Sequence, residues 1–186
     1  MRKQRRKLVA AAIVAALLTL FSQSTLAYYT VTGIATNVVT SGGVQLRIHE
    51  TTADGYPFPE EGVTVIPGDV ISKEVSVENV CEHPFWLRVQ LVKGSTSETL
   101  DAQDALQVVE INDQEWIAHG EYYYFYRPLQ PDERTIPLFE EVCIAGEAVD
   151  QYDVGSILTL TVKAHAVQSE NNPAEHPWEA SGWPEA

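Results

Sequence analysis

The chain contains few cationic side chains for its length. Its 186 residues include 12 Lys and Arg against 26 Asp and Glu, and five of those 12 cations lie within residues 1–7. The remainder of the chain therefore carries seven cations against 26 acidic groups, a net charge of −19 where the whole chain has −14. A surface this acidic repels polyanions, which excludes nucleic acid and anionic lipid surfaces as binding partners. The same charge favours solubility and association with cations.

The sequence also lacks an apolar run of membrane-spanning length. The longest run, residues 8–21, has about 14 residues, whereas a spanning helix needs roughly 20. It follows the basic start of the chain and precedes the small residues Thr25 and Ala27, which is the order of an export signal. Residues 1–27 are therefore predicted to be a signal-peptide helix that signal peptidase cleaves between Ala27 and Tyr28. This predicts a secreted chain with no stable membrane anchor; a retained N-terminal anchor is the alternative.

Cysteine is scarce, with Cys81 and Cys143 as the two examples. In an exported chain an even count predicts one disulfide. A bond between them would close a loop of about 60 residues and stabilise the fold by about 4 kcal/mol. Two separate buried thiols are the alternative. The spacing does not fit a CxxC redox pair or a thiolate zinc site.

Catalytic motifs are missing. The five histidines include no pair spaced as in HExxH, and no nucleophile elbow or phosphate-binding glycine loop occurs. Calcium could find oxygen ligands at two places, but neither follows the EF-hand pattern. We therefore predict no catalytic residues and no cofactor, with zinc and calcium unsupported by any motif. The histidines are His49, His83, His119, His165 and His176, and the oxygen ligands are Asp101 with Asp104, and Asp150 with Gln151 and Asp153.

Most of the remaining sequence has the alternation of β-strands. Apolar and polar residues alternate with a period of two, which places one set of side chains on a core and the other in water. Turn signals separate these runs, and Pro67-Gly68 suits the centre of a type II turn. We expect an all-β fold, a β-sandwich with Greek-key connections, over residues 28–168. The clearest alternating runs are residues 44–48, 75–77, 85–91 and 158–164.

Two segments and one charged residue have a less definite interpretation. Residues 101–108 fit a short helix or an irregular crossover. Arg88 lies on the polar face of its strand and is expected to pair with a carboxylate. Residues 169–186 are rich in Glu, Asn and Pro with few aliphatics, which predicts a mobile acidic tail. Docking of Trp178 and Trp183 on the domain is the alternative for this tail.

Five aromatic residues follow one another near the middle of the chain. On a strand, Tyr122, Tyr124 and Tyr126 share one face, and Tyr123 with Phe125 share the other. Aromatic rings on both faces indicate one buried surface and one that is covered or self-associating. The alternative is that all five belong to the core and rim of the sandwich, since aromatic residues favour strands.

Taken in order, several segments resemble the TasA/camelysin group of secreted proteins, which use a SipW-type signal peptidase. No segment is specific alone, but the ordered set spans nearly the whole chain. The segments are the signal followed by Tyr28-Tyr29-Thr30 and Ala35-Thr36-Asn37, residues 65–69 leading into 72–79, residues 85–89, Trp116 with residues 120–126, residues 135–139 and residues 164–168.

The resemblance implies a jelly-roll or immunoglobulin-like sandwich that serves in the extracellular biofilm matrix or at the cell surface. Some relatives form fibres by donating an N-terminal strand to the next subunit, a form of β-augmentation. Here the donor would be residues 28–39, with the partner a second copy of the chain or another matrix protein. An ordinary first strand in its own domain is the alternative. The candidate donor positions are Tyr28, Tyr29, Val31, Ile34 and Val38.

Two other functions stay open from the same resemblance. Camelysin-type relatives are classed as metallopeptidases, so a secreted metallopeptidase is one alternative. A non-polymerising accessory protein that caps or anchors fibres made by others is the second.

Overall fold

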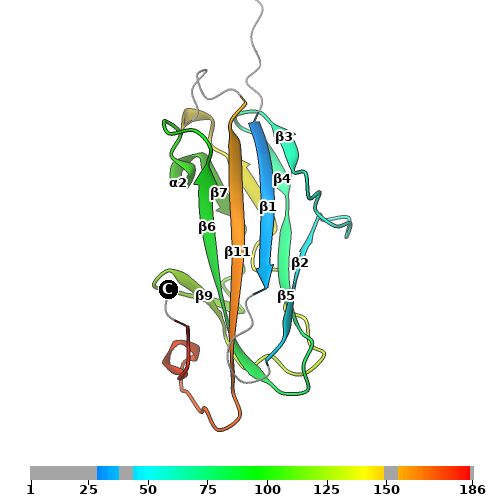
Figure 1. Ribbon diagram of the computed structural model, residues 1–186, viewed down its shortest axis with the longest axis vertical. Coiled ribbons are helices and arrows are strands. Elements are labelled where there is room, and N and C mark those ends of the chain that lie inside the picture. Colours follow the sequence, from blue (N-terminus) through cyan, green and yellow to red (C-terminus); the bar gives the residue numbers. More distant parts are fainter. Residues whose placement is uncertain (1–28, 38–43, 149–154, 185–186) are drawn as a thin grey trace, which may run out of the picture.

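The computed structural model describes residues 29–37, 44–148 and 155–184 (Figure 1). The predicted signal peptide, with its cleavage site at Ala27 and Tyr28, lies outside these ranges. The predicted donor position Val38 and the acidic residues 150–153 also lie outside them. Across the three described ranges, no helix is long and apolar enough to span a membrane.

The described chain is all-β, as the alternating runs predict. The sandwich is built from strands of three to twelve residues, and its helical elements are single turns. The strands are β1 Tyr29–Asn37, β2 Leu46–Thr51, β3 Val63–Val65, β4 Val70–Ser72, β5 Glu74–Asn79, β6 Phe85–Ser95, β7 Leu106–Val109, β8 Trp116–His119, β9 Tyr122–Phe125, β10 Glu141–Ile144 and β11 Ile157–Gln168. The helical turns are α2 Ala102–Ala105, η1 Gly146–Ala148 and η3 Pro177–Glu179.

One large sheet and two small ones make up the fold (Figure 1). The large sheet has the order β3-β1-β11-β6-β9-β8, and the small sheets are β4-β10-β7 and β2-β5. The long strands β6 and β11 run antiparallel over their whole lengths, from Phe85 opposite Gln168 to Ser95 opposite Leu158. The pair β1 and β11 is parallel, unlike the other described strand pairs.

The core lies between the large sheet and the two small sheets. Alternate residues of β11 face it, and Leu158, Leu160 and Val162 are completely buried. From the opposite layer Phe139 and Ile144 are equally buried and belong to the same cluster. Each side chain of this size stabilises the fold by about 1.5–3 kcal/mol through removal from water.

Local sequence signals explain two of the connections. Gly68 has φ +93° and the amide of Asp69 donates to the carbonyl of Ile66 at 3.1 Å, which is the predicted type II turn. Of the two options for residues 101–108, the short helix is found, and the regular strand β7 takes the place of an irregular crossover. The Asp101 side chain accepts from the amide of Gln103 at 2.8 Å and caps α2, and β7 then follows directly.

The predicted disulfide is not found, because Cys81 and Cys143 are both free thiols in the structure. Cys143 lies on β10 opposite Val70 of β4. From Val70 the chain runs through β4 and β5 almost without a break to Asn79, at about 3.3 Å per residue. The two cysteines therefore lie near opposite ends of the sandwich. The Cys81 thiol donates instead to the Asn79 side-chain oxygen at 3.0 Å.

The predicted mobile tail is also wrong for residues 169–184, which we call the C-terminal strap. The strap turns back after β11 and packs beside the end of the large sheet (Figure 1). Its Ala174, Ala180 and Trp183 form an apolar cluster with Trp86 and Val167 of the sheet. The composition argument failed because a few tryptophans supply the contact area that aliphatic residues otherwise give. The folded unit thus extends beyond the predicted limit at residue 168.

Candidate functional site

The strand β1 fills a gap that is one strand wide. On one side it pairs with β11, from Thr30 opposite Ile157 to Asn37 opposite Ala164. On its other side it pairs with β3, with Val31 opposite Val63. Since β3 ends the sheet and β11 already pairs with β6, removal of β1 would leave two facing strand edges unpaired. Unpaired edges of this kind template the addition of another strand.

The sequence of β1 suits such an exchangeable strand. Its nine residues, YTVTGIATN, carry no acidic or basic side chain and are rich in β-branched residues. Of the predicted donor positions, Val31 is completely buried in the core. Tyr29 pairs with Val65 and Ile34 with Thr161 in the backbone register. The structure thus brings three of the five predicted positions into one strand, which lies second from the edge of the large sheet.

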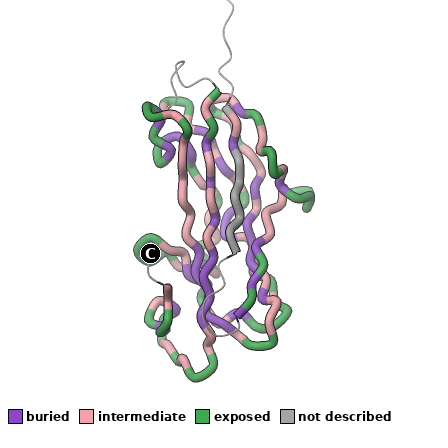
Figure 2. The backbone as a smooth tube through the Cα atoms, viewed as in Figure 1, coloured by how far each residue is buried: buried purple, intermediate pink, exposed green. Residues whose placement is uncertain are grey.

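The outer face of the large sheet carries a second site, beneath the C-terminal strap. Residues Phe85 to Val89 of β6 are buried on both faces, whereas the rest of β6 is only half-buried (Figure 2). Trp86 and Arg88 point to this outer face, because the alternate residues Phe85, Leu87 and Val89 belong to the core. The double burial coincides with the part of β6 that the strap covers.

Hydrogen bonds shape the strap and fix its start. The indole of Trp86 donates to the carbonyl of Asn172 at 3.0 Å, and the Ser169 amide donates to the carbonyl of Pro84 at 3.1 Å. The side chain of Asn172 exchanges two hydrogen bonds with the backbone of Ser181, both at 2.9 Å. One asparagine therefore closes the strap into a compact loop and presents it to the sheet.

Aromatic rings fix the middle of the strap. Trp178 stacks with two imidazoles: His119 of β8 at 4.5 Å and His176 of the strap itself at 4.6 Å, both nearly parallel to it. Tyr124 of β9 meets the rings of Trp178 and Trp183 edge-on, at 6.1 and 5.7 Å. On the outer face of the aromatic run the strap thus covers Tyr124, whereas Tyr126 is 42% exposed. Phe125 faces the core, so the prediction of one buried and one covered surface holds for the centre of the run and not for its end.

Arg88 is the polar centre of this second site. It is 6% exposed, and its guanidinium lies 3.8 Å from the Tyr122 ring and 4.9 Å from the Trp183 ring. Its Nε donates to His165 Nδ1 at 3.2 Å, and its Nη2 donates to the Pro184 carbonyl at 2.6 Å. The expectation that Arg88 pairs with a carboxylate is wrong: among the described residues no acidic group forms an ion pair with Arg88. Ring faces and a carbonyl replace it.

His165 is the other buried ionisable group at this site. It pairs with Arg88 across β11 and β6 and is 7% exposed. Burial lowers the pKa of His165, and the positive charges of Arg88 and Lys163 lower it further. The imidazole is therefore held in its neutral form, with Nδ1 as an acceptor.

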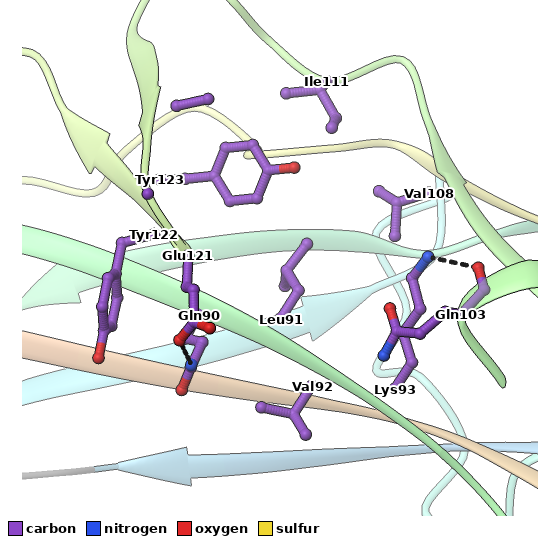
Figure 3. A pocket seen from close by; sticks show the side chains of 12 residues that line it. Gln90, Leu91, Val92, Lys93, Gln103, Val108, Ile111, Glu121, Tyr122 and Tyr123 are labelled. Carbon is purple, nitrogen blue, oxygen red and sulfur yellow. Dashed lines mark hydrogen bonds between the residues drawn. The ribbon is translucent and has the colours of Figure 1, made fainter. Parts of the chain in front are cut away.

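A cleft opens where β6 and β9 separate (Figure 3). The two strands pair only at Arg88 and Val89, and beyond this point a cleft of about 590 Å³ lies between them. Its walls are mixed, with the polar side chains of Gln90, Lys93, Gln103 and Glu121 beside apolar ones. Two hydrogen bonds join the polar groups: Lys93 donates to the Gln103 carbonyl at 3.2 Å and Gln90 to Glu121 at 3.4 Å. Burial lowers the pKa of Lys93. The apolar residues are Leu91, Val92, Val108, Ile111, Ala118 and Tyr123.

The histidines do not come together. His49 contacts Glu78 at 2.8 Å and lowers the pKa of that carboxyl, whereas His83 contacts Glu170 at 3.4 Å. Across the described ranges, no three His, Cys, Asp or Glu side chains are grouped so as to hold a metal ion. Of the oxygen ligands considered for calcium, Asp101 caps α2, and the set at residues 150–153 lies outside the described residues.

Sequence reasoning missed one further buried charge, Lys73. Its side chain is completely buried between β4 and β5, with Nζ 3.0 Å from Glu50 Oε1 and 3.9 Å above the Phe58 ring. No spacing rule identifies such a residue, because its partner is on a different strand. The strap contacts of Arg88 and His165 were missed for the same reason.

The chain matches no protein-family model, no curated protein and no solved structure.

Proposed function

We propose that the mature chain is a secreted structural protein of the extracellular biofilm matrix or cell surface, whose subunits join by exchange of β1. The observation that carries this proposal is the position of β1, which fills a gap one strand wide and pairs on both sides. The same backbone hydrogen bonds form whether β1 comes from its own subunit or from a neighbour. Exchange therefore sacrifices no sheet pairing.

The geometry of the exchange favours an open chain of subunits. Each subunit would donate β1 and accept a neighbour's β1 in the gap between β11 and β3, so donor and acceptor are different surfaces. Such heterologous contacts continue without limit unless a rotation closes a ring. The acidic surface suits this role, because mutual repulsion would keep the subunits apart until a directed contact forms.

The resemblance to the TasA/camelysin group supports the same function and the finer assignment of the sandwich to a jelly-roll or immunoglobulin-like fold. In this proposal cleavage between Ala27 and Tyr28 by signal peptidase frees the segment that becomes β1. Export and activation for assembly would then be one step. The partner is a second copy of the chain.

A non-polymerising accessory protein that caps or anchors fibres is the second candidate. One observation favours it: β1 already occupies the gap in its own subunit, which leaves no free acceptor. The two functions differ in whether β1 leaves its own subunit.

Engineered cysteines at one register pair can separate the two. Val31 and Val63 are directly opposite on antiparallel strands, where Cβ atoms lie close enough for a disulfide. A mixture of chains carrying V31C and chains carrying V63C should give covalent dimers if β1 is exchanged. Wild-type protein, with its two native thiols, is the matched control for background crosslinking.

Electron microscopy of the protein beginning at Tyr28 should then show fibres, and a chain lacking residues 28–39 should show none. The double variant V31C/V63C in one chain reports pairing in cis. If that variant closes its disulfide while the mixture gives only monomers, and no fibres form, strand exchange is wrong and the accessory function stands.

A further inference from the structure

The buried pair of Arg88 and His165 has one defined protonation state. Arg88 Nε is a donor in every state, so the 3.2 Å contact requires His165 Nδ1 to be an acceptor. The proton of the neutral imidazole is therefore on Nε2. Both side chains are more than nine-tenths buried, at 6% and 7% exposed.

Protonation of His165 would place two cations in direct contact. Nδ1 would then carry a hydrogen directed at Arg88 Nε–H, and the hydrogen bond would be lost. The groups that face His165 offer little compensation: the Tyr122 ring lies 5.9 Å away and already has the Arg88 guanidinium at 3.8 Å, and Lys163 of β11 adds another positive charge. On the other side of β11, the residues of β1 include no acid or base apart from Tyr29. Close like charges at a buried site are strongly unfavourable.

The C-terminal strap depends on the same guanidinium. Arg88 Nη2 donates to the Pro184 carbonyl at 2.6 Å, and the Trp183 ring lies 4.9 Å from the guanidinium carbon. Movement of Arg88 away from a protonated His165 would relieve that contact. Such a move breaks the hydrogen bond and the ring contact that hold the end of the strap.

We propose that the C-terminal strap is a pH-controlled clasp, which protonation of His165 releases from the outer face of the large sheet. Release uncovers Trp86 and Tyr124, whose side chains the strap contacts in the closed arrangement. The proposal rests on the geometry around Arg88 and does not depend on exchange of β1.

Other histidines act in the opposite direction but are weaker. Protonated His83 would strengthen its contact with Glu170, yet their side chains are 56% and 47% exposed, and exposed ion pairs contribute little. Protonated His119 and His176 would each gain a cation–π contact with Trp178, but they would also become two positive charges stacked on one ring. The buried pair therefore controls the strap.

Hydrogen exchange measured by mass spectrometry on the full mature chain tests whether the C-terminal strap is released at low pH. Samples are compared at about pH 7.5 and about pH 5, on either side of the usual histidine pKa. After correction for intrinsic rates, amides of the strap should lose protection at the lower pH, because a His165 pKa that is lowered while the strap is closed means that protonation favours release. Amides of the β11–β6 ladder should keep their protection and serve as the internal control.

Variants assign the effect to His165. H165Q keeps an oxygen that can accept from Arg88 but cannot titrate, so its strap should be protected equally at both pH values. H83Q is the matched control and should respond like the wild type, as should H119Q/H176Q. If H165Q loses protection in β11 as well, H165N replaces it as the non-titrating variant.

Three results would overturn the proposal. The first is equal protection of the wild-type strap at both pH values. The second concerns H165Q and H165N: the pH response of the strap is unchanged in the variant that keeps its β11 protection, or both variants lose their β11 protection. The third is loss of the response in H119Q/H176Q, which would assign control to the rings around Trp178.

Discussion

Lys73 and Glu50 form a buried ion pair that links the two small sheets, with Nζ 3.0 Å from Oε1. The Lys73 side chain is completely buried and that of Glu50 is 12% exposed. Burial lowers the pKa of Lys73, and the negative charge of Glu50 opposes that shift. Neither Nζ nor Oε1 has a well-aligned hydrogen bond within the described part of the chain, so each relies on the other's charge.

Removal of one partner should therefore be far more harmful than removal of both. E50Q leaves the Lys73 ammonium buried and unpaired, which should cost about 3–5 kcal/mol of unfolding free energy. K73M/E50L replaces the pair by apolar groups and should be close to the wild type or more stable. Urea unfolding at neutral pH measures both. Equal losses in the single and double variants would show that the pair is not coupled.

The two free thiols predict that reductant has no effect on stability. Cys81 and Cys143 lie near opposite ends of the sandwich, and Cys81 donates to Asn79 instead. The melting temperature should be the same with and without reductant. The intact mass of the unreduced protein should equal that of the reduced chain, and two thiols should react after denaturation. A mass two units lower before reduction would restore the disulfide.

The alternating pattern was sufficient to predict the long strands. The run at residues 85–91 lies in β6, and that at residues 158–164 lies in β11, since the period of two is a local property that burial on one face imposes. The turn at Gly68 was predictable because positive φ restricts the residue type. Such features depend only on neighbours in the sequence.

The sites depend on contacts between distant residues, which no local pattern records. Trp178 and His119 are stacked although 59 positions separate them, and Arg88 meets Pro184 across 96. The strap was predicted to be mobile from its amino-acid composition. Composition does not record contacts between distant residues, such as the contact of the Trp183 ring with the Arg88 guanidinium. The cysteine prediction failed similarly, since an even count says nothing about distance.

A bidentate pair between Arg127 and Glu133 predicts a modest loss of stability in acid. Hydrogen bonds from Arg127 are the largest cause of the lowered Glu133 pKa, and the Gln130 amide adds a third donor at 2.8 Å. A carboxyl with a lowered folded-state pKa contributes stability that is present above its unfolded pKa and lost as the pH falls through the folded value.

E133Q should therefore cost about 1 kcal/mol at neutral pH, because both side chains are partly exposed and solvent screens the pair. The loss should begin to shrink as the pH falls below the ordinary Glu pKa of about 4.3, and it should disappear once the pH is below the lowered folded-state pKa, where the wild-type carboxyl is also neutral. Urea unfolding across this range provides the measurement. A deficit that stays constant from neutral to acid pH would contradict an electrostatic origin.

The two glycines at the junction of β4 and η1 predict opposite responses to the same substitution. Gly68 has φ +93° at the turn before β4, and a side chain there is strained although no atom lies within 4 Å of its Cβ position. Gly146 packs beside this turn, has no positive φ, and its added Cβ would meet the Gly68 amide nitrogen at an ordinary 3.7 Å. G68A should therefore cost about 1–2 kcal/mol from backbone strain alone. G146A should be neutral or slightly stabilising, because alanine loses less conformational freedom on folding. Urea unfolding gives the unfolding free energy of both variants. A loss in G146A as large as that in G68A would mean that steric crowding, and not φ, determines the cost of a side chain at this turn.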